Sequence, residues 1–121
     1  MPLGFKAIHY KQIQSSCVEE AGAEGVRVRW LINKENDGAQ HFAMRLFDVA
    51  PNGHTPKHSH NWEHEVYVLE GDGVVFCEGS EKQIKSGYAV FVPPNTVHYF
   101  KNTGKKKLCF LCLVPYSKTR K

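Results

Sequence analysis

The chain has 121 residues, 41% of them hydrophobic, and a formal net charge of +4, which is typical of one small globular domain. No apolar run approaches the roughly 18 residues that a membrane-spanning helix needs, and the first residues lack the apolar core of a signal peptide. We therefore expect a cytoplasmic protein without a membrane partner.

The N-terminal third carries few clear signals before residue 25. Residues 5–10 are a candidate edge strand, and residues 15–25 are rich in turn-forming residues. Residues 33–40 also have the composition of a loop. Between them, residues 25–32 alternate cleanly, which predicts a half-buried strand whose apolar face is formed by Val26, Val28, Trp30 and Ile32.

Residues 42–49 predict the next strand, with Phe42, Met44 and Leu46 on one face. Arg45 lies among apolar residues on the other face. Two interpretations of Arg45 are open at this point. It is either a surface arginine whose stem covers apolar atoms or a buried ligand for an anion.

The C-terminal half is a series of short apolar runs separated by turns. Gly, Pro, Asn and Asp residues divide it into predicted strands at residues 64–69, 74–78, 82–85, 88–92, 97–100 and 108–114. No stretch shows a long helical period. The pattern predicts an all-β fold, either a closed barrel or a double-sheet jelly roll.

The basic runs and the cysteines favour ordinary structural roles. The runs at residues 105–107 and 118–121 fit a solvated turn and a tail, and no stacking aromatic residues accompany them, so we expect no nucleic-acid partner. The four cysteines of a leaderless chain are expected to be reduced. Cys109 and Cys112 face opposite ways on a predicted strand, which favours small apolar fillers over a thiol pair.

The histidines indicate a metal site. His58 and His60 are two residues apart, so on an extended backbone both rings point to one face. His64 opens the following predicted strand, and His98 lies in a later one. Imidazole suits zinc, copper, iron and nickel, and four converging neutral rings can hold a divalent ion. His54 lies outside this spacing and is a weaker candidate.

The spacing around these histidines resembles the first signature of the cupin superfamily. Four residues rather than the usual five separate Gly53 from His58, and His60 follows as the second histidine of the motif. Position 64 and Gly71 then fall at the family spacing. The departure is at position 64, where His64 stands in place of the usual glutamate.

A second, separate stretch resembles the second cupin signature. Gly87, Pro93, His98 and Asn102 all occupy the positions that this signature requires. Asn95 stands where a glycine is usual, which is a mild change because asparagine also tolerates a left-handed turn.

The resemblance implies a cupin-type jelly-roll barrel. It implies one domain over residues 1–121, with a motif-bearing core at about 40–115 and an N-terminal strand extension at 1–39. It also implies the four-histidine subgroup of small single-domain cupins, in which one divalent transition metal (Mn, Fe, Ni, Cu or Zn) is held by His58, His60, His64 and His98. Small cupins commonly form homodimers through edge strands, and the N-terminal strand and residues 108–114 fit that role.

The histidine at position 64 changes the expected chemistry. Four neutral ligands leave the charge of the ion uncompensated, so the ion should be a stronger Lewis acid and should resist oxidation. The motif glutamate often serves as general base in relatives. Glu63 is the candidate for that catalytic role here, because strand alternation turns Glu65 away from His64. Trp62 is a second candidate at the mouth of the site, with simple packing as the alternative.

Three functions fit such a site, and each has a small molecule as its partner. The first is a metal-dependent dioxygenase, or a related oxidoreductase, acting on a small enol, diol or aromatic substrate. The second is a non-redox isomerase or lyase for a sugar or keto acid. The third is a non-catalytic module that binds or senses a small ligand. The fold alone does not choose between them.

Overall fold

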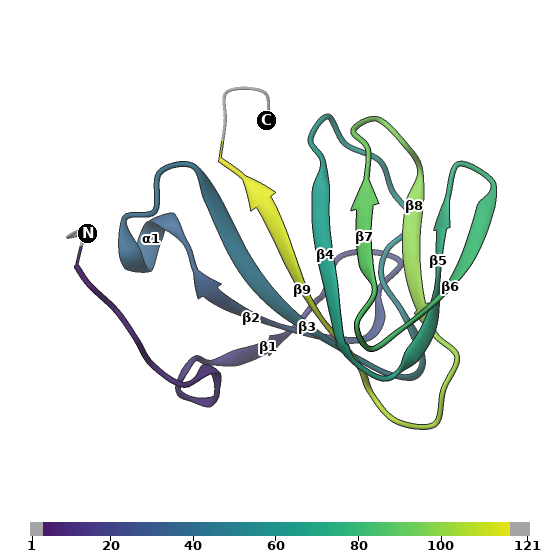
Figure 1. The fold of residues 1–121 in the computed structure, drawn as a ribbon, viewed down its shortest axis with the longest axis horizontal. Coiled ribbons are helices and arrows are strands. Elements are labelled where there is room, and N and C mark those ends of the chain that lie inside the picture. Colours follow the sequence, from purple (N-terminus) through teal and green to yellow (C-terminus); the bar gives the residue numbers. More distant parts are fainter. Residues whose placement is uncertain (1–3, 117–121) are drawn as a thin grey trace.

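The computed structural model describes residues 4–116 and shows a strongly curled antiparallel sheet (Figure 1). Its order is β6-β5-β8-β3-β9-β4-β7, and β2 and β1 continue the sheet from β3. In chain order the elements are the short 3-10 helix η1 (Tyr10–Gln12), β1 (Ser15–Cys17), β2 (Glu24–Ile32), α1 (Lys34–Asp37), β3 (Phe42–His54), β4 (His64–Glu70), β5 (Asp72–Cys77), β6 (Ser80–Lys85), β7 (Ala89–Val92), β8 (His98–Asn102) and β9 (Leu108–Pro115). The expected all-β jelly-roll barrel is confirmed.

The N-terminal region differs from the sequence prediction. Residues 5–10 form no strand, and the first strand is instead β1, within the stretch expected to turn. β1 carries no apolar alternation that would mark it as a strand in the sequence. It is extended because it pairs with β2, where the guanidinium of Arg27 donates to the hydroxyl and the carbonyl oxygen of Ser15. Within residues 4–116 no helix is long and apolar enough to cross a membrane. The basic tail at residues 118–121 lies outside the described residues.

β3 is the longest strand, and it turns one face toward the barrel interior. Ala43 and Val49 are fully buried in the core, and Arg45 and Phe47 line an internal cavity. Phe42, on the opposite face, is 61% exposed. The inward face of β3 is therefore the one that carries Arg45, which rules out a surface position for this arginine.

Three stacked aromatic rings form the floor of the cavity. The ring centroid of Phe110 lies 5.4 Å from that of Phe47 and 4.8 Å from that of Phe100. The rings come from β9, β3 and β8, so three strands that are distant in sequence meet here. Phe100 and Phe110 are almost completely buried, and their burial is a major part of the hydrophobic stabilisation of the barrel.

The proposed edge role of residues 108–114 is wrong. β9 pairs with β3 on one side and with β4 on the other, so both of its backbone edges are already hydrogen-bonded. It cannot extend the sheet into a second subunit. β1 pairs with β2 alone among the described strands, and homodimer formation through this N-terminal strand stays a prediction.

Asn102, the last residue of β8, links three segments inside the barrel. Its buried amide nitrogen donates to the carbonyl oxygens of Val49 and Lys106, both at 2.8 Å, and its amide oxygen accepts from Gly104. Its side chain is fully buried. The amide therefore satisfies backbone groups that would otherwise be buried without partners.

Replacing Asn102 should destabilise the protein strongly. We expect Asn102→Ala to lower the free energy of unfolding by about 2–4 kcal/mol, because buried backbone groups lose their hydrogen bonds. Urea denaturation measures the change. The neighbouring exposed Thr103→Ala is the control and should change the free energy by less than about 0.5 kcal/mol. Equal effects of the two substitutions would contradict this role of Asn102.

Candidate metal centre

The two histidine-bearing segments are joined through their backbones. The His58 N–H donates to the carbonyl oxygen of His98 (3.2 Å), and the His98 N–H donates to the carbonyl oxygen of His58 (2.9 Å). Asn95 adopts the expected left-handed conformation, with φ of 63°. Its N–H donates to the carbonyl oxygen of His60 at 2.7 Å. The Pro-Asn turn thus holds the loop that carries His58 and His60 against β8.

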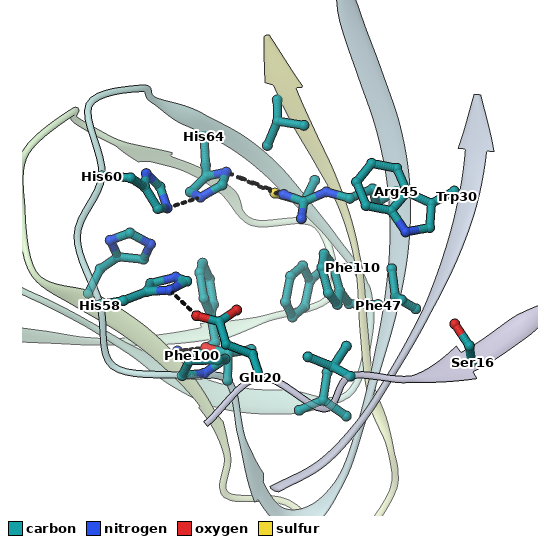
Figure 2. A pocket seen from close by; sticks show the side chains of 18 of the residues that line it. Ser16, Glu20, Trp30, Arg45, Phe47, His58, His60, His64, Phe100 and Phe110 are labelled. Carbon is teal, nitrogen blue, oxygen red and sulfur yellow. Dashed lines mark hydrogen bonds and ion pairs between the residues drawn. The ribbon is translucent and has the colours of Figure 1, made fainter. Parts of the chain in front are cut away.

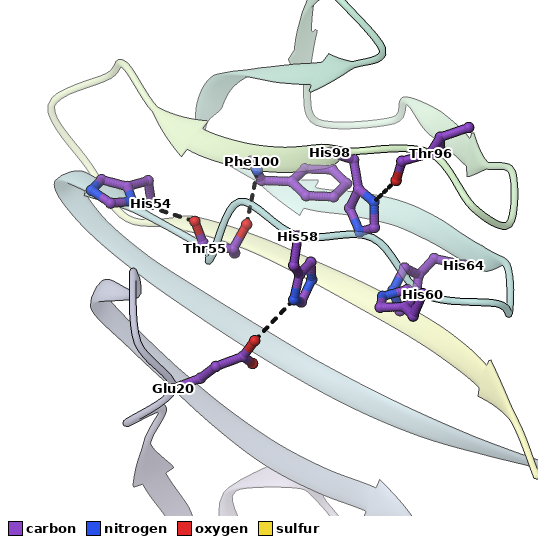
Figure 3. Close-up of polar contacts among 9 residues, drawn as sticks. All are labelled: Glu20, His54, Thr55, His58, His60, His64, Thr96, His98 and Phe100. Carbon is purple, nitrogen blue, oxygen red and sulfur yellow. Dashed lines mark hydrogen bonds and ion pairs between the residues drawn. The ribbon is translucent and has the colours of Figure 1, made fainter. Parts of the chain in front are cut away.

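These contacts bring four imidazole rings together (Figure 3). One ring nitrogen of each of His58, His60 and His98 lies within 4.8 Å of the others, an arrangement that can hold a metal ion. The Nε2 atoms of His60 and His64 are 3.0 Å apart, and the ring centroids of His64 and His98 are 5.3 Å apart. His54 lies apart from the cluster, with its Nδ1 near the carbonyl oxygen of Thr55.

Hydrogen bonds orient three of the rings. Nδ1 of His60 lies 3.2 Å from the carbonyl oxygen of Trp62, and Nδ1 of His98 lies 2.9 Å from that of Thr96. A carbonyl oxygen only accepts, so Nδ1 carries the proton in both rings and Nε2 keeps its lone pair. Nδ1 of His58 lies 2.9 Å from the carboxylate of Glu20, which selects the same tautomer. This is the arrangement of histidines prepared for metal binding.

His64 is held differently. Its Nδ1 lies 3.3 Å from the thiol sulfur of Cys112 and 3.5 Å from Nη2 of Arg45. A guanidinium only donates, so the sulfur of Cys112 is the neighbour that can accept a hydrogen bond from this nitrogen when Nε2 offers its lone pair to a metal. The expectation that Cys112 is only an apolar filler therefore misses a polar contact.

The environment keeps the rings of His60, His64 and His98 uncharged at neutral pH. Burial lowers the pKa of His64 from 6.5 to about 2, with a further contribution from the positive charge of Arg45. Burial also lowers the pKa of His60 to about 4 and lowers that of His98, although backbone hydrogen bonds to Trp62 and Thr96 oppose both shifts. Neutral imidazole is the form that binds a metal, so the rings need not lose protons first.

The rings open onto a cavity of about 430 Å³ (Figure 2). Five Phe and Trp side chains line it together with the histidines and several aliphatic residues, and the cavity extends from the histidines past Phe47 and Phe110 toward Trp30. Besides the histidines, Glu20 and Arg45 are the acidic and basic side chains among its lining residues. The arrangement suits a flat ligand with polar groups at the histidine end.

The two predicted catalytic residues lie in different places. Trp62 lines the cavity and stacks on His60, with ring centroids 4.0 Å apart and an angle of 3° between the planes. Glu63 is exposed and lines a separate depression with Asn61 and Glu65. The carboxylate that the structure brings to the histidines is Glu20, which no motif in the sequence indicates.

The low pKa values predict acid sensitivity of the metal-free protein. The unfolded chain takes up protons near the ordinary histidine pKa of 6.5, whereas folded His60 does so only near 4 and folded His64 near 2. The free energy of unfolding should therefore be highest above 6.5 and should fall as the pH decreases through about 4. Urea titrations of chelator-treated protein between about pH 7.5 and about pH 4.5 measure it. His64→Asn should make the decline shallower, and an unchanged slope in that variant would contradict the assignment.

Comparisons with known proteins agree with this geometry. Residues 45–114 match the family described as the cupin domain. The oxalate-binding protein of Thermotoga maritima is 34% identical over 98 residues, which cover 77% of this chain and 78% of that protein. The structure of the polyketide cyclase RemF from Streptomyces resistomycificus is 33% identical and has a TM-score of 0.86, with 96% of this chain and 89% of that chain covered.

Other solved structures show the same architecture. A predicted oxalate decarboxylase from Thermotoga maritima has a TM-score of 0.81 at 25% identity, over 93% of this chain and 100% of that chain. The family match spans more than half of the sequence, and both cupin signatures contribute histidines to one cluster. The chain belongs to the cupin family.

Proposed function

We propose that this protein is a metal-dependent enzyme that acts on a flat, oxygen-rich substrate by Lewis-acid rather than oxidative chemistry. One divalent metal is held by His58, His60, His64 and His98. The observation that carries the proposal is the cavity, partly lined by aromatic side chains, that opens directly beside this cluster of histidines. The similarity to a polyketide cyclase supports a poly-carbonyl or phenolic substrate class.

The donor set fits a divalent metal. In three of the rings a hydrogen bond holds a proton on Nδ1, so that Nε2 is the nitrogen that can coordinate. A bound divalent ion would supply a Lewis acid that polarises a carbonyl or enolic oxygen of the substrate. Since none of these four ligands is a carboxylate, the positive charge at the site stays available to a substrate oxyanion.

The other residues of the cavity would bind and orient the substrate. Phe47, Phe100 and Phe110 offer a continuous aromatic surface on which a conjugated ring can lie, and they exclude water from the reacting end. Glu20 holds the Nδ1 proton of His58 and so keeps that ring oriented toward the cluster. Attack of an enolate carbon on a carbonyl carbon forms one C–C bond, and protonation of the resulting alkoxide gives a β-hydroxy ketone. Elimination then breaks one C–H and one C–O bond and releases water. No oxidation state changes overall, so the cyclisation needs no oxidant.

Metal binding should depend on both the histidines and Glu20. We expect the purified protein to contain one divalent metal per chain and the His58→Ala/His60→Ala double variant to contain none. Glu20→Gln should weaken metal affinity roughly tenfold, because the neutral amide holds the His58 proton less strongly. Competition with a chromogenic chelator measures the affinity.

A neighbouring glutamate supplies the matched control for this experiment. Glu19 is exposed on the same segment, so Glu19→Gln removes the same charge without touching His58. Equal affinities of the Glu19→Gln and Glu20→Gln variants would contradict the orienting role of Glu20. Absence of metal from the wild-type protein, even after reloading, would overturn the proposed function.

The reaction should proceed without oxygen. We expect zinc-loaded protein to convert an aromatic poly-β-ketone to a cyclised product under anaerobic conditions, with the loss of one water detected by mass spectrometry. The double histidine variant should be inactive. Oxygen uptake in proportion to turnover would instead identify the dioxygenase reaction expected from the sequence. A tightly retained ligand without any turnover would indicate a binding module.

A further inference from the structure

Arg45 is a cation inside the cavity whose charge no carboxylate of the described residues balances. Its guanidinium lies over the rings of Trp30 and Phe47, with its central carbon 5.3 Å and 4.8 Å from the two centroids. Nη2 donates to the sulfur of Cys112 at 3.1 Å. Nε is buried without a hydrogen-bond partner in residues 4–116. The ion pairs of this part of the chain are formed by other residues.

The neighbours of Arg45 fix its position but do not neutralise it. The sulfur of Cys112 accepts a hydrogen bond from the guanidinium, and it is not a carboxylate. Arg45 is half-buried and its Nε is shielded from solvent, and such partial desolvation of a cation is unfavourable unless an anion compensates it. The two aromatic rings hold the planar group rigidly, which prepares it for a planar anion such as a carboxylate.

The residue at position 64 determines whether Arg45 has a carboxylate of the same chain to pair with. The cupin signature usually has glutamate there, and the ring nitrogen of His64 lies 3.5 Å from Nη2 of Arg45. A glutamate carboxylate at this place would be close enough to form an internal ion pair with Arg45. Histidine brings no negative charge, so the guanidinium remains free for a ligand at the metal end of the cavity (Figure 2).

We infer that Arg45 is the specificity-determining residue for a substrate carboxylate, and that the substrate is a planar conjugated acid. The carboxylate binds the guanidinium, the conjugated rings lie along Phe47 and Phe110, and a neighbouring oxygen reaches the histidine cluster. This inference rests on the proposed function, since it names the substrate class of the same site. It also selects between the two interpretations of Arg45 that the sequence leaves open.

A pair of probes that differ only in charge tests the inference. Isothermal titration calorimetry of 2-naphthoate and 2-naphthamide gives the carboxylate preference of the purified protein. We expect the wild-type protein to bind the acid roughly tenfold more tightly, a difference of about 1.4 kcal/mol. In Arg45→Met the two probes should bind within about twofold of each other, because the length of the side chain is kept and the charge is lost.

Two further variants sharpen the result. Lys82→Met removes a cation from the exposed side of β6, which does not line the cavity, so it should keep the preference of the wild-type protein. His64→Glu should abolish the preference, because the new carboxylate pairs with Arg45. Should Arg45→Met fail to fold, as judged by near-ultraviolet circular dichroism, His64→Glu decides. A preference that persists in the folded Arg45→Met or in His64→Glu, or that is missing from the wild-type protein, overturns the inference.

Metal analysis of the same samples separates this inference from the proposed function. A carboxylate preference that depends on Arg45 in a protein without metal would support the inference and defeat the function. Bound metal together with a preference that ignores Arg45 would leave the function standing and overturn the inference.

Discussion

The site depends on one backbone contact, the pair of hydrogen bonds that joins His58 to His98. His58 lies in the loop between β3 and β4, and His98 begins β8, so the bridge closes the barrel end between two segments that are far apart in sequence. Asn95 adds a third hydrogen bond, to the carbonyl oxygen of His60. Because backbone groups make these bonds, the imidazoles stay free to converge, and ring tautomers are then set by separate acceptors.

The electrostatic character of the cavity follows from the same geometry. Burial keeps the rings of His60, His64 and His98 neutral, and the position usually held by glutamate carries no negative charge. Arg45 is the fixed positive charge at the His64 side of the cluster, and Glu20 is the fixed negative charge at the His58 side. A metal ion bound there would add to the positive potential near Arg45. Both the proposed Lewis-acid chemistry and the proposed carboxylate recognition depend on the absence of a carboxylate at position 64.

Much of the architecture and the histidine cluster could be predicted because the relevant signals are local. Side-chain alternation on extended backbone places His58 and His60 on one face, and turn residues mark the ends of the short strands. The left-handed turn at Asn95 was predictable for the same reason, since a single residue's backbone preference governs it. The missed strand β1 is the converse case, because pairing with β2 rather than its own composition orders it.

The remaining features required the folded chain. Glu20 reaches His58 across 38 residues, and Cys112 meets His64 across 48, and no local pattern encodes either approach. The inward orientation of Arg45 depends on which face of β3 the curled sheet encloses, a choice that alternation alone leaves open. Likewise, the sequence of β9 does not show whether it lies at an edge of the sheet. Its pairing with both β3 and β4 places it in the interior of the sheet. Composition and spacing thus predicted most of the strands, the turns and the set of histidines. Long-range packing determined which residues orient the histidine rings and which charged side chains line the cavity. These residues are distant in sequence and come into contact only when the sheet curls into the barrel.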